Sequence, residues 1–386
     1  MEFLEVIETI RAEEASVQKL FGSEGKGARQ GTRTPQYMKK LAEAAKLVAD
    51  VMSGRRPAHL LREAMTTSDF PYLMGDILDR QLLAAYQETI PSWPNYCNRH
   101  LVRDFRTVKR FGVYGGDTVL DTVAEQQEYP SSKIDEDTPY TYSVGKHGRR
   151  MPFSWEAMIN DDLDALKDIP ERFGRAARRS EEKFVASLFV DANGPHASFY
   201  TVGNANIVIG NPALSISGLQ TAMKVLGAQT DQDGEPIVID VVELVIPQGL
   251  EIDALSILSA TQLWLDSNLA AGTKKQNLVT ENWMKAKLHL SKNSYIPIVA
   301  SSSHGSTSWF LFANPDNGRP ALEMGFLRGH EQPEIFMKAP NATQIGGGTD
   351  PMNGDFDTDS IEYKVRHVFG GSRMDPKMTV ASNGSG

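Results

Sequence analysis

The sequence predicts an α+β fold with more than one hydrophobic core. Residues 168–194 repeat apolar side chains at helical spacing, which indicates a long helix. Residues 236–247 are rich in β-branched side chains and bounded by prolines, which favours a buried strand. Residues 361–369 alternate apolar and charged side chains, as a half-buried strand does. These helical and strand-forming segments predict a mixed fold of both kinds of element.

Length and composition indicate a globular protein. With 386 residues, 40% hydrophobic and 23% charged, the chain is long enough for two or three cores. No basic leader precedes an apolar run, and no run of about eighteen apolar residues occurs, so we expect neither export nor a membrane span. The single cysteine, Cys97, excludes an internal disulfide, suits a reducing cytoplasm and is expected to be a small buried thiol. The net charge of −9 argues against a surface built to bind nucleic acid.

Residues 168–194 are predicted to form one long helix. Asp168 can cap its first turn, Pro170 suits a first-turn position, and Gly194 follows the last periodic residue. One face should be buried, although Gly174 and Glu181 fall within the same arc. The apolar residues of that face are Phe173, Ala176, Ala177, Phe184, Val185 and Leu188.

The opposite side of this helix carries a basic ridge about 16 Å long at about 1.5 Å per residue. This ridge consists of Arg172, Arg175, Arg179 and Lys183. Four interpretations are open: the ridge binds an acidic partner, faces DNA, pairs with the helix's own Glu171 and Glu182, or is a solvated charged face.

Residues 1–94 are predicted to form an N-terminal helical arm. Amphipathic helices are expected at 2–21 and 38–52, joined by a glycine-rich connector, and a later helix carries Leu73, Ile77, Leu82 and Tyr86. Helices with such narrow apolar faces bury little apolar surface among themselves, so we expect the arm to pack on the main body or on another copy of the chain.

Residues 107–151 are predicted to form an extended loop. A strand is expected at 101–111, with 149–153 returning beside it, and the long excursion between them has little core-forming content. The middle of this loop carries seven acidic residues but a single basic residue, Lys133. We predict that Asp135, Glu136 and Asp137 contact Arg172, Arg175 and Arg179 of a neighbouring copy. The acidic residues are Asp117, Asp121, Glu125, Glu128, Asp135, Glu136 and Asp137.

The remaining segments predict a mixed α+β region. Helices are expected at 153–166, 214–226, 252–258 and 262–269. Strands are expected at 236–247, within 278–292, at 294–300, and after a turn within 301–314. The tail from Asp359 is expected to contain a half-buried strand.

No convincing catalytic constellation is found, so we expect no enzyme, cofactor or metal site. The stretch His330–Glu334 lacks the second histidine of the zinc-protease motif, and residues 346–350 lack the lysine of a P-loop. Residues 301–306 place hydroxyls beside an imidazole, but a polar surface turn is the better interpretation.

A calcium loop is also rejected. Asp355, Asp357 and Asp359 are spaced like the first ligands of such a loop, but Ser360 stands where glycine is needed and Arg366 where the last carboxylate belongs. Asn341 begins a glycosylation sequon that matters only in a secreted chain.

Four stretches of the sequence are informative together: FSWEAMINDDL before the long helix, PQGLEIDALSIL, TENWMKAKLHL, and the closing VRHVFGG with ASNG. The order of the predicted parts resembles the tailed-bacteriophage major capsid proteins and their Hong Kong type fold. More narrowly, these motifs are similar to those of the major head subunit family of Mu-like phages. This similarity covers about Leu73 to Gly384, whereas residues 1–70 fit only a general N-terminal arm.

The resemblance implies a domain organisation. The expected parts are an arm at 1–94, a peripheral domain at 95–106 and 152–211 with the long helix as its spine, the extended loop at 107–151, an axial domain at 212–295, and a return to the peripheral domain over 296–386.

The resemblance also implies a function. The chain would assemble with itself into hexamers and pentamers of an icosahedral virion shell, with scaffold, portal and decoration proteins as further partners. Packaged double-stranded DNA would lie on the inner face without sequence specificity, and no membrane would take part. The alternatives are an encapsulin-type compartment shell and an intracellular enzyme with an unrecognised pocket.

Overall fold

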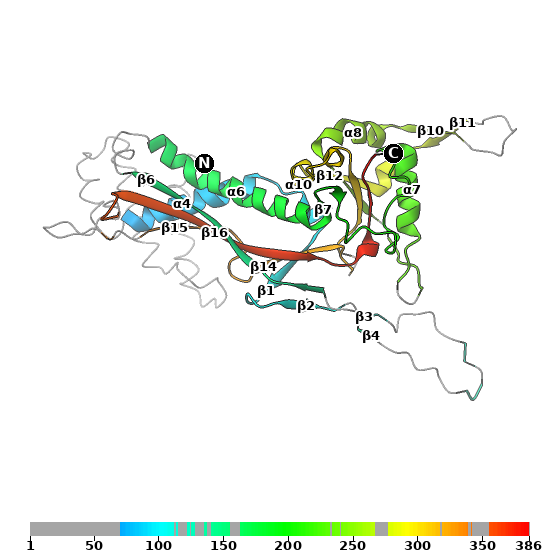
Figure 1. The fold of residues 1–386 in the computed structure, drawn as a ribbon, viewed down its shortest axis with the longest axis horizontal. Coiled ribbons are helices and arrows are strands. Elements are labelled where there is room, and N and C mark those ends of the chain that lie inside the picture. The colour runs from blue at the N-terminus through cyan, green and yellow to red at the C-terminus, as the bar shows by residue number, and fades with distance from the viewer. Residues whose placement is uncertain are drawn as a thin grey trace, which may run out of the picture. The chain divides into compact units, whose positions relative to one another are not determined.

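The structure is a computed structural model, and contacts divide the chain into two compact units. Unit 1 consists of residues 1–90, 146–178 and 332–367, and unit 2 of residues 91–145, 179–331 and 368–386. The predicted helices of the arm before residue 70 lie outside the described residues. The structure describes residues 70–111, 113–114, 122–123, 125–127, 135–136, 140–154, 163–231, 234–239, 241–266, 277–316, 319–338, 341 and 355–385 (Figure 1).

Helix α6 (Leu163–Phe189) starts earlier and ends earlier than the predicted helix 168–194. The prediction that Asp168 caps it is wrong, because a complete turn precedes that residue. Pro170 lies inside the helix, where its missing N–H leaves the Leu166 carbonyl without an intrahelical partner. The predicted helix at 153–166 is wrong at both ends, since residues 153–154 belong to a strand and residues 163–166 to α6, and its middle, residues 155–162, lies outside the described residues.

The C-terminal end of α6 is set by a tight turn. Strand β7 (Val190–Asp191) follows the helix directly and pairs with β8 (Gly194–Pro195) in antiparallel fashion. Gly194 has a φ angle of 112°, a conformation that favours glycine, so this residue shapes the turn after the helix.

Unit 1 packs α4 (Phe70–Glu88) and the first part of α6 against three strand segments. The first half of β16 (Ser360–Arg373) pairs with β15 (Glu334–Met337) in antiparallel fashion and also pairs with β6 (Gly145–Ser154). The predicted tail strand and the predicted helix around Leu73 to Tyr86 are therefore confirmed. The fully buried apolar residues of this unit's core are Leu82, Ile169, Phe173, Tyr363 and Val365.

Helices α4 and α6 approach each other closely at Gly174. A Cβ atom at this position would lie 2.5 Å from the Leu82 carbonyl oxygen and 2.9 Å from the Tyr86 backbone nitrogen. Four residues further along α6, the Nε of Arg178 donates to the Tyr86 carbonyl oxygen at 2.8 Å, and its guanidinium lies 3.5 Å from the centre of the Tyr86 ring. Gly174 therefore lies on the apolar face of α6 because helix α4 packs against it at this position.

The centre of unit 2 is a four-stranded sheet in the order β12–β9–β13–β17. Strand β12 (Leu288–Lys292) runs parallel to β9 (Val242–Ile246), and β13 (Trp309–Ala313) pairs antiparallel with both β9 and β17 (Thr379–Ser382). Every residue of β9 and β13 is buried, because both faces of the sheet are covered. The strand predicted within 236–247 is thus confirmed over its second half.

Alternate side chains of this sheet enter two different cores. Phe310 and Phe312 of β13 pack with Phe189 at the end of α6. Trp309 and Leu311 of the same strand face the other core, which α7 (Ile216–Gly227) and α8 (Glu251–Ser259) cover. Both helices were predicted from the sequence and are confirmed.

A further strand group in unit 2 contains the end of β16. Strand β1 (Asn98–Val102) follows a short 3-10 turn, η1 (Trp93–Asn95), and runs parallel to β14 (Leu322–Leu327). Strand β14 is antiparallel to the second half of β16. Separate two-stranded ribbons are formed by β2 (Val108–Arg110) with β5 (Tyr140–Tyr142), and by β3 (Val113–Tyr114) with β4 (Asp135–Glu136).

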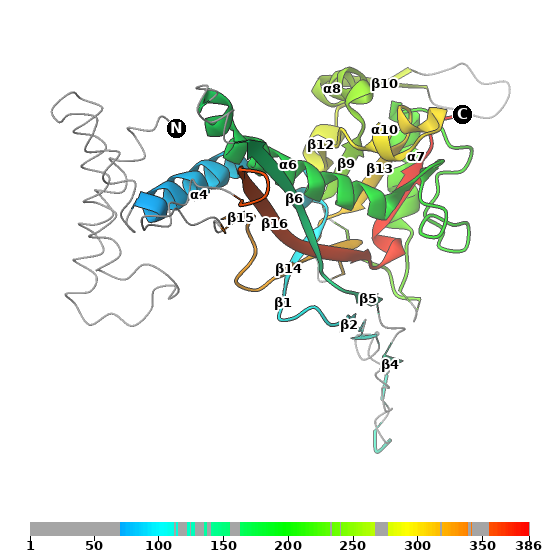
Figure 2. The same ribbon diagram turned by 60° about the vertical axis from the view of Figure 1, so that its left-hand side comes forward.

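Three further predictions are wrong. Residues 262–269 were expected to be helical, but β10 (Gln262–Asp266) pairs with β11 (Asn277–Glu281) as a ribbon that leads away from α8 in both views (Figures 1 and 2). Residues 294–300 were expected to be a strand, but they hold the short helix α10 (Ile296–Val299). Residues 149–153 do not return beside 101–111, because β5 is the partner of β2.

Short elements complete the described chain. The strands predicted within 278–292 are confirmed as β11 and β12, with the one-turn helix α9 (Met284–Lys287) between them. The turn and strand predicted within 301–314 are confirmed as the 3-10 turn η3 (Ser303–Gly305) and β13. Two further 3-10 turns are η2 (Gln248–Leu250) and η5 (Pro376–Met378).

Candidate functional site

The basic ridge is exposed along α6, as predicted. Arg172, Arg175, Arg179 and Lys183 all present exposed side chains. Arg175 forms an ion pair with Glu171 at 3.0 Å between Nη2 and Oε2, and the two side chains are 47% and 38% exposed. An exposed pair of this spacing contributes only about 0.3–0.5 kcal/mol, so it leaves the ridge able to bind an outside partner.

Glu182, the other acid considered as a partner for the ridge, instead binds residues outside α6. Its carboxylate accepts hydrogen bonds from the backbone N–H groups of Ser92 and Trp93, from the Ser92 hydroxyl at 3.0 Å, and from the Asn293 amide at 3.2 Å. Burial raises the pKa of Glu182, and the hydrogen bonds from Ser92 and Trp93 act in the opposite direction. Glu182 therefore caps the turn that leads into η1.

Glu181 has a related role inside the core. Its side chain is fully buried and accepts a hydrogen bond from the Trp93 indole Nε1 at 3.1 Å. Trp93 lies in the same core and contacts Phe326 at 5.8 Å between ring centres. Glu181, which interrupts the predicted apolar face of the helix, thus accepts the hydrogen bond that the buried Trp93 indole needs.

The acidic loop is described only in part. Asp135 and Glu136 form β4, whose backbone pairs with Val113 and Tyr114 of β3, and Glu125 is exposed. Other predicted acids of the loop, Asp117, Asp121, Glu128 and Asp137, lie outside the described residues. The predicted contact of Asp135, Glu136 and Asp137 with Arg172, Arg175 and Arg179 stays a prediction.

The base of this loop is attached to the sheet through Glu323 of β14. This residue is buried, and its Oε1 accepts hydrogen bonds from the Tyr142 hydroxyl at 2.5 Å and from the Arg110 Nε at 3.0 Å. Burial and the bond to Glu323 raise the pKa of Tyr142. Sequence reasoning missed this group, and its only signal was one acid inside the apolar stretch 322–327.

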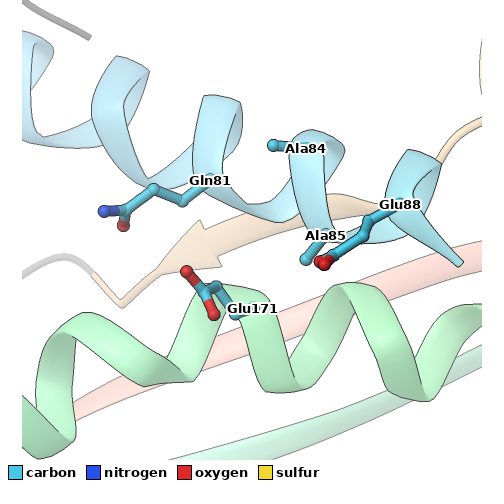
Figure 3. A pocket seen from close by; sticks show the side chains of 5 residues that line it. All are labelled: Gln81, Ala84, Ala85, Glu88 and Glu171. Atoms are coloured by element: carbon cyan, nitrogen blue, oxygen red, sulfur yellow. The ribbon is translucent and has the colours of Figure 1, made fainter. Parts of the chain in front are cut away.

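A shallow groove of about 240 Å³ lies between α4 and α6 in unit 1. Figure 3 shows Glu171 of α6 across from Gln81, Ala85 and Glu88 of α4, with Ala84 beside them. Two carboxylates, an amide and two alanines provide neither a nucleophile nor a metal-binding set. We therefore interpret the groove as the seam between two packed helices.

The stretches rejected as chemical sites have structural roles where they are described. Asp355 accepts hydrogen bonds from the Lys338 ammonium and the Asn341 amide, which lower the pKa of its carboxyl group. Ser302 caps η3 by accepting from the His304 backbone N–H, so this stretch is the polar turn that was predicted. Cys97 is buried, as predicted, and burial raises the pKa of its thiol.

Two searches of the described residues found no match. In the part of the chain that the structure describes, no group of three or more His, Cys, Asp or Glu could hold a metal ion. Among the described helices, none combines the length and apolar character that crossing a bilayer needs.

Comparisons with known proteins give one family. A family model described as phage capsid protein matches residues 138–382, which is more than half of the chain. No curated protein matches the sequence.

Solved structures resemble the chain at low sequence identity. The chain is similar to a chain of Mycobacterium phage Patience at 12% identity and a TM-score of 0.44, over 82% of this chain and 89% of that chain. It is similar to a chain of Gordonia phage Cozz at 14% identity and 0.42, over 74% and 83%. The virus-like particle from Pyrococcus furiosus matches at 9% identity and 0.41, over 80% and 99%. Because these TM-scores lie below 0.5, the assignment rests on the family match.

Proposed function

The chain belongs to a phage capsid protein family, and from this premise we propose that it is the major head subunit of a tailed phage. The proposed subunit assembles with itself into hexamers and pentamers of an icosahedral shell around double-stranded DNA. The observation that supports the proposal is the family match over residues 138–382, which includes α6, the central sheet of unit 2 and all of β16. Membership in the Mu-like head family, and scaffold, portal and decoration partners, are parts of the same proposal.

The proposed contact between copies joins the acidic loop of one subunit to the basic ridge of another. The ridge offers an exposed row of cations along α6. The loop places Asp135 and Glu136 on a short ribbon that leads away from the Glu323 attachment. Opposite charges on two separate surfaces of one chain favour contact between copies.

The energy of such a contact comes from repetition. An exposed ion pair contributes only about 0–1 kcal/mol, so a single pair decides little. A shell repeats the same pair in every subunit, and each subunit is held by several neighbours at once, so weak contacts add to a large effective affinity.

Charge reversal tests this contact. Changing Asp135, Glu136 and Asp137 to lysine should leave the subunit folded and lower the yield of particles, because none of the three belongs to an apolar segment that predicts a core. Changing Arg172, Arg175 and Arg179 to glutamate in the same chain should restore part of the yield. Particle yield is measured by sedimentation and electron microscopy, and folding by circular dichroism.

A matched control separates local pairing from net charge. Lys224, Lys285 and Lys287 are exposed on α7 and α9, and none of them belongs to α6. Their change to glutamate alters the net charge as much as reversal of the ridge does. Rescue by this control as well as by the reversed ridge, or no rescue by the ridge at any ionic strength, would contradict the proposed pairing.

The shell function has its own test. Purified particles should be icosahedral in electron micrographs and should contain double-stranded DNA when isolated from virions. Shells that form only as DNA-free compartments would favour the encapsulin-type alternative, and a small soluble oligomer with no particles would contradict both.

A further inference from the structure

The orientation of the extended loop depends on side chains more than on sheet hydrogen bonds. Its root is the ribbon β2–β5, which has three paired residues per strand, from Val108 opposite Tyr142 to Arg110 opposite Tyr140. Among the described strands this ribbon pairs with neither larger sheet. A ribbon this short has little stability of its own, so it needs other contacts to hold a fixed direction.

Glu323 supplies a contact to each strand of the ribbon. Arg110 lies on β2 and Tyr142 on β5, and both donate to the same oxygen, Oε1, of Glu323 at 3.0 Å and 2.5 Å. Glu323 itself is fixed within a sheet, because β14 is paired on both sides, with β1 and with β16. One carboxylate thus joins the two strands of the loop root to the body of the unit.

The Tyr142 ring is seated on the sheet next to this carboxylate. Gly325 is the next residue on the same face of β14, and a Cβ atom there would lie 2.6 Å from the Tyr142 ring and 3.0 Å from its hydroxyl oxygen. Val102 and Val368 pack in the same small buried cluster as Tyr142. The Tyr142 ring can pack this closely on β14 only because position 325 has no side chain.

The two partners of the ion pair differ in their access to water. The Glu323 side chain is 3% exposed, whereas the Arg110 side chain is 34% exposed. A carboxylate buried to this degree is strongly destabilised when its donors are removed, while an arginine near the surface can turn to water. The arrangement therefore favours two discrete states, with both donors bound or with the ribbon displaced.

We propose that Glu323 is an orientation latch for the extended loop, which positions the segment that begins at β2 and ends at β5 for contact with the next copy of the chain. While the latch is closed, the loop leaves unit 2 in one direction. When it opens, the ribbon turns about the exposed link Arg103–Thr107 and about the exposed Ser143, while the buried Val144 stays in its cluster. The assembly role of this latch rests on the function proposed above, whereas the latch itself is a property of the isolated subunit.

Hydrogen exchange of the full-length, unassembled subunit tests the latch. Tyr142→Phe removes the hydroxyl and keeps the ring on Gly325. Peptides that cover residues 104–114 and 135–142 should exchange on the order of tenfold faster, as expected for loss of one hydrogen bond to a charged group. Peptides of β9 and β13 should be unchanged. Glu323→Gln is a second variant, and it should accelerate exchange in the same peptides.

Tyr200→Phe is the matched control. The Tyr200 hydroxyl is also buried in unit 2 and shares a hydrogen bond at 3.0 Å with Thr379 of β17, which belongs to a different sheet from β14. This variant loses the same atom and should leave exchange at the root unchanged. Unchanged exchange in Tyr142→Phe, or equal acceleration in Tyr200→Phe, would overturn the latch.

Particle yield then tests the assembly role separately. Tyr142→Phe should lower the yield relative to both the unaltered chain and Tyr200→Phe. Faster exchange with a normal yield would overturn the positioning role, although the attachment would stand. If the unaltered chain forms no particles, the proposed function fails while the exchange result still decides the latch.

Discussion

Replacing Gly174 with alanine should destabilise unit 1, although the same change usually stabilises a helix. Alanine is favoured over glycine inside a helix by about 0.5–1 kcal/mol. At Gly174, however, the added Cβ would lie 2.5 Å from the Leu82 carbonyl oxygen, 2.9 Å from the Tyr86 nitrogen and 3.1 Å from the Ala85 Cβ. The first two of these atoms belong to the backbone of α4, so no rotation of a side chain can make room.

The steric term should exceed the helix propensity term. Inserting a methyl group into a packed contact costs about 1–3 kcal/mol, and a clash with two backbone atoms belongs in the upper part of that range. Subtracting the propensity gain leaves a net loss of roughly 1–2 kcal/mol. The loss should be local, because α4 must move away from α6, which also lengthens the hydrogen bond from Arg178 to Tyr86.

Urea unfolding and hydrogen exchange of the unassembled subunit measure this effect. Exchange should rise in peptides of α4 between residues 79 and 88 and remain unchanged in the sheet of unit 2. Gly227→Ala is the control, since Gly227 lies at the end of α7 with no atom within 4 Å of its added Cβ. That variant should gain about 0.4–1 kcal/mol. A Gly174→Ala chain as stable as the unaltered one would refute the close-packing argument.

Two further changes test the polar interior of unit 2. Burial raises the pKa of Glu243, so the folded state holds the proton of this carboxyl group more tightly than the unfolded state does. The free energy of unfolding should therefore fall as pH rises from about 4.3 through the folded pKa. Glu243→Gln should flatten this fall in urea unfolding, and an unchanged slope would contradict the assignment. Asn282 donates to the carbonyl oxygens of Ile257 and Ala260 at the end of α8, at 2.7 Å and 2.8 Å. Asn282→Ala should cost about 1–3 kcal/mol in thermal unfolding, and Asn282→Asp, which keeps the acceptor but not the donors, should be destabilised as well.

Periodicity predicted the elements whose burial pattern is regular. The first half of β16 and helix α7 were predicted because one side of each faces a core and the other is more polar, whereas α8 was predicted although it also exposes Ile252 and Leu255. The start of α6 was missed because Asp168 and Pro170 form a convincing first turn although the helix begins at Leu163. A proline inside a helix removes one hydrogen bond, a loss that tertiary packing can outweigh.

Short apolar segments were predicted less well. Residues 262–266 are apolar enough for either a helix or a strand, and only their pairing with residues 277–281 decides for a strand. The reverse holds for Ile296–Val299, whose β-branched residues favour a strand but which form one helical turn, with Ile296 buried in the core. Local propensity is worth about 1 kcal/mol or less per residue, so such segments follow their tertiary contacts.

Glu181 and Glu182 illustrate why sequence patterns reveal a core more readily than a site. Both acids serve the turn at Ser92 and Trp93, about ninety residues earlier in the chain, and no local signal encodes that distance. Periodicity records only which side chains avoid water, so it detected the arc and treated Glu181 as an interruption. Periodicity does not mark a surface that binds another copy, because the residues of such a surface are exposed in the single chain, as those of the ridge are. Charge reversal on the ridge and loop keeps every apolar residue in place, so it can change assembly without changing the fold, and this is why it is the sharpest test of the proposed contact.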